Sequence, residues 1–264
     1  DRKLGGILSI YEKFQGVDPR ESPMKIFPAV HYSMGGLWAD YRRTAAGGLL
    51  PGAPENHQTN IPGLYAIGEC DYQYHGANRL GANSLLSCIF TGLFVAPCIE
   101  NMLGSLPDSA NDEKYGQLLR GQRAVKQLEH ENLLKREGGR ENPYVLHQQL
   151  GDVMTRAATV VRHNDQLRDA IATVNELCEK VEHCALSDTG NWTNQNVLFL
   201  KSLRVMFPLA KAILHGALAR DECRGAHYKP QFAMPGIEDG SPAERRQQAE
   251  AWCDAFEEKN RKWL

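Results

Sequence analysis

A run of small residues around one arginine is the part of the sequence best suited to bind a charged ligand. Arg79 lies within HGANRLGANSLL, which leads directly into an apolar segment. Glycine and alanine let a ligand approach the backbone closely, and a helix start offers unpaired N–H groups and a partial positive charge. The planar guanidinium adds a two-pronged donor for a carboxylate or phosphate. The run predicts a corner that binds an anion or an electron-rich ring, although a capped helix with a surface arginine has the same composition.

A glutamate at the end of a short apolar segment is a second candidate for ligand binding. The residues Leu64–Ile67 have the character of a strand, and Gly68 and Glu69 follow directly. An acidic side chain in this place can accept hydrogen bonds from ribose or ribityl hydroxyls, as in nucleotide-binding folds. A turn with a solvated glutamate gives the same pattern more often, so the spacing alone leaves both interpretations open.

Two further motifs contain a histidine but indicate no chemistry by themselves. His31 lies in the glycine-rich run HYSMGG, which lacks the spacing of metal ligands. His227 lies in RGAHYKP, which indicates only a tight polar turn. The seven cysteines are odd in number and form no C-x-x-C pair, so we predict neither a disulfide framework nor a metal site.

The composition is that of a folded protein and gives no sign of a nucleic-acid partner. The chain has 264 residues, of which 42% are hydrophobic and 23% charged, and its formal net charge is −2. These values argue against global disorder. The lack of a basic excess argues against binding to nucleic acid.

Up to about residue 103 the sequence is rich in glycine, proline and short apolar runs, which predicts short elements joined by loops. We expect one helix over Leu4–Phe14 and another from Asn83 towards Met102. The segment Arg42–Asn60 contains several glycines and prolines and is predicted to be a surface excursion between two strands. The predicted strands are Lys25–Phe27, Leu37–Tyr41 and Leu64–Ile67.

The apolar run Ser84–Ile99 is predicted to be a buried helix and not a membrane span. It is shorter than the ~20 residues that a helix needs to cross a bilayer. Gly92 and Pro97 also interrupt it. The residues from Asp1 to Gly5 likewise lack the features of a signal peptide.

After about residue 103 the apolar residues recur with the 3.6-residue period of amphipathic helices. Asn142 followed by Pro143 is typical of a helix start, and Ser241 with Glu244 fits a capping box. The short connections favour an antiparallel bundle. The predicted apolar stripes are Tyr115, Leu118, Val125 and Leu128; Leu146, Leu150, Val153, Ala157 and Val160; Leu167, Ile171, Val174, Cys178 and Val181; and Leu200, Leu203, Met206, Leu209 and Ile213.

Four runs taken together resemble one known family. HYSMGG, TNIPGLYAIGEC, HGANRLGANSLL and RGAHYKP occur in the order and approximate spacing of the flavoprotein subunit of succinate dehydrogenase and fumarate reductase. The similarity covers essentially the whole chain and is greatest to the bacterial subgroup whose membrane anchor carries cytochrome b. L-aspartate oxidase is a relative, but it is similar to HYTCGG and NRMASNSLLE patterns, which fit less well.

The resemblance implies a mixed, mostly α fold: the C-terminal part of a Rossmann-like FAD-binding domain followed by an antiparallel helical bundle. The domains it implies are the end of a capping domain (1–22), part of the FAD-binding domain (23–103), the helical bundle (104–222) and the start of a C-terminal domain (223–264). No G-x-G-x-x-G follows an N-terminal strand. We therefore expect the chain to be a C-terminal fragment that is inactive by itself.

The resemblance also assigns roles to individual residues. By resemblance, His31 and Arg79 hold the carboxylate of the substrate, and Glu69 contacts the ribityl chain of FAD. The arginine that transfers the substrate proton lies upstream of this chain in the family, so no catalytic residue and no metal ligand is expected here. The residues that begin the helix beside the isoalloxazine are Asn83, Ser84 and Leu85.

The activity implied for the whole protein is oxidation of succinate to fumarate by hydride transfer to FAD. Electrons would pass to an iron–sulfur subunit in a complex anchored by cytochrome b, with the flavoprotein peripheral on the cytoplasmic side of the bacterial inner membrane. Fumarate reductase, which runs the same site in reverse, stays open as an alternative. A third possibility is that the chain by itself is a helical interaction domain without activity.

Overall fold

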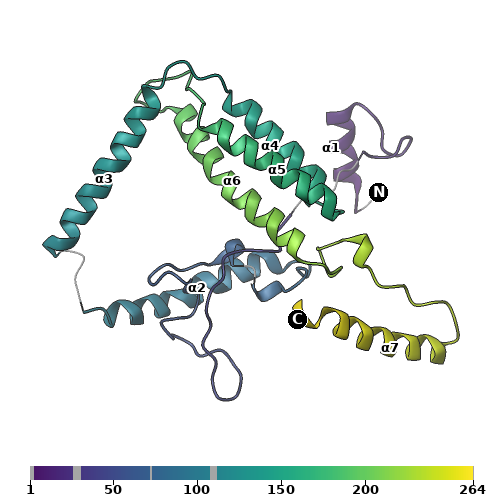
Figure 1. Cartoon of the computed structure of the whole chain (residues 1–264). Coiled ribbons are helices and arrows are strands. Elements are labelled where there is room, and N and C mark those ends of the chain that lie inside the picture. The colour runs from purple at the N-terminus through teal and green to yellow at the C-terminus, as the bar shows by residue number, and fades with distance from the viewer. Residues whose placement is uncertain (1–2, 26–30, 72, 108–111, 264) are drawn as a thin grey trace. The chain divides into compact units, whose positions relative to one another are not determined.

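The computed structural model describes residues 3–25, 31–71, 73–107 and 112–263 (Figure 1). The chain divides into two compact units, Asp1–His31 and Tyr32–Leu264. Regular structure in the described ranges is helical, and these ranges contain no β-strand. The domain boundaries predicted at residues 22, 103 and 222 stay predictions.

The first unit contains one helix, α1 (Gly5–Gln15), which confirms the helix predicted there. It ends at Gly16, whose φ of +68° lies in the left-handed region that favours glycine. The N–H of Gly16 donates to the carbonyl of Glu12 at 2.8 Å and closes the last turn. Of the predicted strand Lys25–Phe27, the last two residues lie outside the described ranges, and Lys25 is not in a strand.

The strands predicted at Leu37–Tyr41 and Leu64–Ile67 are wrong. Both segments instead run beside His57, whose N–H donates to the carbonyl of Asp40 and whose carbonyl accepts from the N–H of Ala66, each at 2.9 Å. Each segment makes only two such backbone hydrogen bonds with residues 57–59, and Gln58 and Tyr65 form an isolated bridge. A ladder needs several consecutive pairs on a neighbouring strand. The expected part of a Rossmann-like sheet is therefore not seen in the residues that the structure describes.

The second unit begins its helical part with α2 (Asn83–Gly104), which confirms the predicted helix start. The helix continues through Gly92 and Pro97, as expected for a helix that runs from Asn83 towards Met102. The predicted burial is wrong, since only 17% of its most apolar window is buried. By length and composition alone α2 would suffice to cross a bilayer, as core helices of water-soluble proteins also do. The buried residues form one narrow stripe: Ser87, Thr91, Val95 and Cys98.

Three helices of the second unit pack together: α4 (Pro143–Ala158), α5 (Asn164–Val181) and α6 (Gln195–Ala219) (Figure 1). Asn142 caps α4 by accepting a hydrogen bond from the N–H of Tyr144 at 2.9 Å, as predicted. The stripes predicted for α4 and α5 contribute Leu146, Leu150, Ala157, Leu167, Val174 and Val181 to the buried core. Val153, Ile171 and Cys178 are only partly buried, and Val160, which follows α4, is exposed. The most deeply buried core side chains include Leu146, Leu167, Val174, Leu200, Phe207 and Leu214.

The predicted stripe of α3 (Glu113–Leu134) is wrong. Leu118, Val125 and Leu128 are exposed, and only the last two residues of the helix, Leu133 and Leu134, join the core. The helix therefore meets the core of the other helices only at its C-terminal end, and the bundle seen in the described residues has three members.

The predicted stripe of α6 is correct at its start and wrong further along. Leu200 and Leu203 are buried, as predicted, but Met206, Leu209 and Ile213 are exposed. One residue turns an α-helix by about 100°, so a stripe displaced by one position points away from the core. The residues that continue the buried face are Phe207, Ala210, Leu214 and Ala217.

The chain continues into α7 (Pro242–Asn260), which starts with the predicted capping box. The side chain of Ser241 accepts from the N–H of Glu244, and the Glu244 carboxylate accepts from the N–H of Ser241. Within the described ranges, short 3-10 helices occupy four turns: η1 (Gly68–Cys70), η2 (Gln73–His75), η3 (Pro230–Phe232) and η4 (Arg261–Trp263). Two of them, η1 and η2, lie in the loop that carries the predicted site residues.

Candidate functional site

Tyr32 is the residue around which two of the sequence motifs meet. Its hydroxyl lies 3.3 Å from Oγ of Ser87 in α2, and Nε2 of His75 lies 3.1 Å from the same Oγ. The rings of Tyr32 and His75 meet edge to face with centroids 5.1 Å apart. Cζ of Arg79 lies 5.5 Å from the Tyr32 ring centroid, within the range of a cation–π contact. HYSMGG and HGANR are thus joined through one buried aromatic side chain.

The role of Tyr32 was missed in the sequence. An aromatic residue inside a glycine-rich turn can indicate a packing contact, because its large ring tends to be buried against a neighbouring segment. Burial raises the pKa of the Tyr32 phenol above its ordinary value. The phenol is therefore neutral at physiological pH and presents a ring face to Arg79.

Glu69 joins the first motif to the loop before α2. Its Oε1 accepts a hydrogen bond from the N–H of Ser33 at 2.7 Å. One residue on, the carbonyl of Cys70 accepts from the N–H of Leu37 at 2.8 Å. The N–H of Gly68 donates to Oγ1 of Thr91 at 3.0 Å, which fixes this turn on α2. Glu69 thus lies at the junction of three segments and, as an exposed side chain, is accessible to a ligand.

His31 is exposed and is the last residue of the first unit, whereas Arg79 belongs to the second. Their joint action on one carboxylate stays a prediction. The other predicted site residues, Glu69 and the start of α2, lie in the same unit as Arg79.

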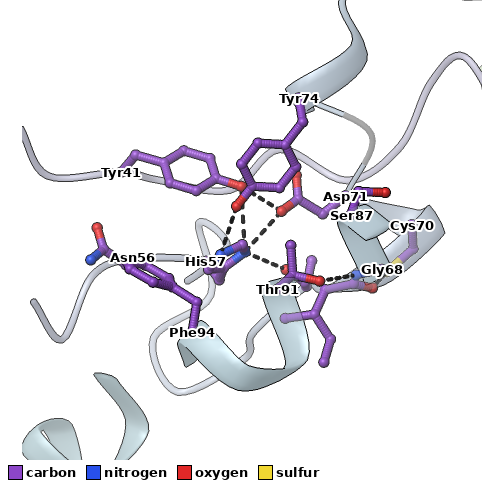
Figure 2. A network of polar contacts seen from close by, with 12 residues as sticks. Tyr41, Asn56, His57, Gly68, Cys70, Asp71, Tyr74, Ser87, Thr91 and Phe94 are labelled. Atoms are coloured by element: carbon purple, nitrogen blue, oxygen red, sulfur yellow. Dashed lines mark hydrogen bonds and ion pairs between the residues drawn. The ribbon is translucent and has the colours of Figure 1, made fainter. Parts of the chain in front are cut away.

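A second polar network lies beside this loop and connects it to the segment predicted as a surface excursion (Figure 2). Nδ1 of His57 lies 2.9 Å from Oδ2 of Asp71, and the hydroxyl of Tyr41 donates to the same oxygen at 2.5 Å. Nε2 of His57 lies 2.9 Å from the hydroxyl of Tyr74. His57 and its neighbour Asn56 are fully buried, so the end of this segment is not a surface excursion. We call these four residues, Tyr41, His57, Asp71 and Tyr74, the His57 network.

The protonation of the two phenols in the His57 network follows from their surroundings. Burial raises the pKa of Tyr74 to about 12, and burial together with the hydrogen bond to Asp71 raises that of Tyr41 further. Both phenols are therefore neutral donors at physiological pH. Oδ1 of Asp71 is buried and has no hydrogen-bond partner among the described residues, so this carboxylate is held through its other oxygen.

The RGAHYKP turn contains a third cluster, built from buried charged groups. Glu222 is fully buried, and its carboxylate accepts hydrogen bonds from Nε of Arg220 at 2.8 Å and Nε of Arg224 at 3.0 Å. Burial alone would favour the neutral acid, but the bonds from the two arginines hold the Glu222 pKa below its ordinary value. The pair of arginines thus keeps a carboxylate charged inside the protein.

His227 belongs to the same cluster and is neutral. Its Nε2 donates to the carbonyl of Arg220 at 2.9 Å, so Nδ1 is the atom that accepts from Nη1 of Arg162 at 2.7 Å. Burial, followed by the charges of Arg220, Arg162 and Lys229, lowers the pKa of His227 to about 4. No ion is needed to explain this histidine, and no group of three or more His, Cys, Asp or Glu side chains in the described ranges could hold a metal.

Comparison with known proteins identifies the family. Residues 147–256 match the family model for the fumarate reductase flavoprotein C-terminal domain, and residues 1–85 match an FAD binding domain. The chain is 47% identical over 232 residues to the succinate dehydrogenase flavoprotein subunit of Bacillus subtilis, which covers 88% of this chain and 37% of that protein. The chain belongs to the flavoprotein subunit family of succinate dehydrogenase and fumarate reductase.

Other members of this flavoprotein family are also similar to this chain in sequence and structure. The fumarate reductase flavoprotein subunit of Escherichia coli is 28% identical over 228 residues, or 86% of this chain and 35% of that protein. The FrdA subunit in a structure of E. coli quinol fumarate reductase superposes with a TM-score of 0.73 at 27% identity, over 90% of this chain and 38% of that chain. A chain of the Mycobacterium smegmatis Sdh1 complex superposes with a TM-score of 0.68 at 27% identity, over 89% of this chain and 36% of that chain. The chain thus spans little more than a third of the length of these relatives.

FAD is the cofactor of this flavoprotein family, and the start of α2 has a chemistry that fits the flavin. Ala82, with φ of +65°, precedes the helix, and no side chain caps it. The first turn carries no acidic residue, so its N–H groups and the helix dipole can face an electron-rich ring or an anion. The residues of that turn are Asn83, Ser84 and Leu85, and their assignment to the flavin stays a prediction.

Proposed function

We propose that the chain is part of a flavoprotein that oxidises succinate to fumarate and passes the electrons to an iron–sulfur subunit. The observation that carries this proposal is the position of Arg79 over Tyr32, in a loop that also holds Glu69 and leads into α2. One guanidinium thereby lies in the same loop as the residues proposed to bind the cofactor. The 47% identity to a succinate dehydrogenase flavoprotein supports this direction of reaction.

The proposed task of Arg79 is to hold one carboxylate of the substrate. A planar guanidinium binds a carboxylate through two parallel hydrogen bonds, which fix the orientation as well as the charge. His31 supplies a further donor to the same end of the substrate. Held in this way, the dicarboxylate presents its central carbons in one orientation, which is the main contribution that positioning makes to the rate.

The proposed task of the α2 start is electrostatic. When bound, FAD accepts a hydride from the substrate and becomes more negative. The uncapped first turn, Asn83 to Leu85, places partial positive charge where that negative charge develops. Glu69 accepts hydrogen bonds from the ribityl hydroxyls. The group that removes the substrate proton is expected outside this chain.

The proposed partners follow from the family. The iron–sulfur subunit receives the electrons, and a membrane anchor with cytochrome b holds the complex. The flavoprotein would then lie peripherally on the cytoplasmic side of the bacterial inner membrane. Structures of a quinol fumarate reductase and of an Sdh1 complex among the neighbours support membership of such an assembly.

The test uses the complete flavoprotein in its complex, purified with FAD. Succinate is supplied with an artificial electron acceptor, and in a separate assay fumarate is supplied with a reduced viologen. We expect faster turnover with succinate. Faster fumarate reduction would assign the reverse direction, and turnover with neither substrate would overturn the proposal.

A further inference from the structure

We propose that Gly225 and Ala226 are positioning residues that hold the Arg79 loop in place by direct backbone contact with Ala77. The inference rests on the proposed function, because it concerns the same carboxylate-binding arginine. It assigns a role to the RGAHYKP turn, which lies far from Arg79 in the sequence.

The contact between the two segments is close enough to tolerate only glycine. The N–H of Ala226 donates to the carbonyl of Ala77 at 3.0 Å. Gly225 has φ of +58°, and a Cβ placed on it would lie 2.6 Å from the carbonyl carbon of Ala77 and 2.8 Å from its Cβ. Cβ atoms do not approach other atoms so closely, and the obstacle here is backbone and cannot rotate away. Any side chain at position 225 has to push the two segments apart.

The turn that makes this contact is itself held firmly. The backbone of Arg224 and His227 forms two mutual hydrogen bonds, N–H to carbonyl, at 3.0 and 3.1 Å. The buried Glu222 carboxylate binds the side chain of Arg224, and the His227 ring binds Arg162. Because Glu222 and His227 are buried and paired with arginines, moving the turn would break charge-assisted bonds largely shielded from water.

The turn also connects the Arg79 loop to the packed helices. The N–H of Arg162 donates to the carbonyl of Tyr228 at 3.0 Å, and Nε of Arg162 donates to the carbonyl of Ala158 at the end of α4 at 2.9 Å. A series of hydrogen bonds therefore connects the core of α4, α5 and α6, through the RGAHYKP turn, to Ala77. The helical core takes part in setting where the substrate-binding arginine lies.

Ala77 is only two residues before Arg79, so a shift of one moves the other. The guanidinium of Arg79 also lies over the ring of Tyr32, and the Tyr32 hydroxyl contacts Ser87. A displacement of the loop would change the distance between the guanidinium and the bound carboxylate, and misplacement by about 1 Å can cost ~100-fold in rate. The cofactor contacts proposed for Glu69 and the start of α2 do not involve Ala77.

The test is Gly225→Ala in the complete flavoprotein complex. The dissociation constant for malonate, a dicarboxylate that is not oxidised, is measured from the change in flavin absorbance. We expect malonate binding and the KM for succinate to weaken by about 10- to 100-fold, with FAD content unchanged. A purely structural role for Gly225 would lower the melting temperature and leave the malonate affinity of the folded fraction unaltered, and this result would overturn the proposal.

Gly138→Ala is the matched control. Gly138 also has a left-handed φ, +68°, but a Cβ there would meet nothing within 4 Å. The control carries the backbone strain without the clash, and it should bind malonate as the wild type does. If wild-type protein with FAD binds neither malonate nor succinate, the proposed function itself fails. If wild type and Gly225→Ala bind malonate equally well, only this inference is overturned.

Glu222→Gln is a milder variant for the case that Gly225→Ala does not fold. It keeps the volume of the side chain and weakens its bond to Arg224, which loosens the turn without a clash. We expect malonate affinity to fall by several-fold relative to wild type. If folded Glu222→Gln binds malonate as tightly as wild type, the proposal is overturned, as it would be by an unaltered affinity in Gly225→Ala.

Discussion

Nδ1 of His57 lies 2.9 Å from Oδ2 of Asp71, and neither side chain is accessible to solvent. His57 adopts φ of +65°, which is unusual for a residue with a side chain. The hydroxyls of Tyr41 and Tyr74 complete the surroundings of the imidazole (Figure 2). The pair joins the segment before position 60 to the loop that leads to Arg79, and the energy of the contact offsets the backbone strain.

Asp71→Ala should destabilise the chain by about 2–4 kcal/mol. Removing the carboxylate leaves buried polar groups without their main partner, although Nδ1 of His57 retains the carbonyl of Ala66 at 3.2 Å. The measurement is urea denaturation of the chain. The matched control is Glu250→Ala, which removes an ion pair with Arg246 whose side chains are 66% and 82% exposed and should change little. Equal effects of the two substitutions would contradict the burial argument.

Leu150→Ala should cost about 2–5 kcal/mol, because the side chain is almost completely buried in the core of α4, α5 and α6. Ile171→Ala should cost less, since Ile171 is only partly buried against the same core. Leu118→Ala, on the exposed face of α3, is the control and should stay near zero. Melting temperatures in the order Leu118→Ala, Ile171→Ala, Leu150→Ala, from highest to lowest, would agree with the structure. Any other order would show that the core has been assigned wrongly.

The stability of the chain should fall with acid because of His227. Its pKa is lowered from 6.5 to about 4 by burial and by the nearby cations Arg162, Arg220 and Lys229. The unfolded state therefore binds more protons between these two values, so the stabilisation is complete above pH 6.5 and is lost as pH falls towards 4. The difference corresponds to about 3 kcal/mol.

The measurement for His227 is the free energy of unfolding across this pH range in wild type and in His227→Gln. The amide can still accept from Arg162 and donate to the carbonyl of Arg220, but it does not titrate. We expect the wild type to lose more stability on acidification than the variant. If the free energy of unfolding falls equally with pH in the two proteins, His227 does not contribute to the acid sensitivity.

Arg79→Lys in the complete flavoprotein should greatly reduce kcat/KM for succinate and leave FAD bound. Lysine keeps the charge but loses the planar pair of donors that orients a carboxylate. Arg246→Lys, at an exposed position of α7, is the control for the same chemical change. Near-normal turnover in the Arg79→Lys variant would remove Arg79 from the carboxylate-binding role.

The elements that the sequence predicted well are those with a local cause. Gly16 ends α1, Asn142 starts α4, and Ser241 with Glu244 starts α7, and each acts on backbone groups within four residues. The periodic stripe of α5 was correct in part: Leu167, Val174 and Val181 are buried, whereas Ile171 and Cys178 are only partly buried. The stripe of α6 failed from position 206 onwards, since which of two adjacent apolar residues is buried depends on the neighbouring helix.

The contacts that escaped prediction join residues far apart in the chain. Tyr32 and Ser87 are 55 positions apart, and Asp71 and His57 are 14 apart. Neither pair has a local signature, because only the fold decides which side chains meet. The predicted strands failed similarly, since a strand is stabilised by its neighbours and not by its own residues. Residue type and spacing already marked Arg79 and Glu69 as candidates for ligand binding, whereas their individual roles rest on the resemblance and stay predictions.

The exposed face of α2 should determine whether this chain associates in solution. Leu85, Leu86, Ile89 and Leu93 are each more than 60% exposed, and a contiguous apolar surface of this kind promotes association in water. At preparative concentrations the chain should sediment as a mixture of species and bind an apolar fluorescent dye. Mild detergent or charged substitutions such as Leu93→Glu should restore a single species. Handling conditions for the measurements above are therefore determined by a single helix.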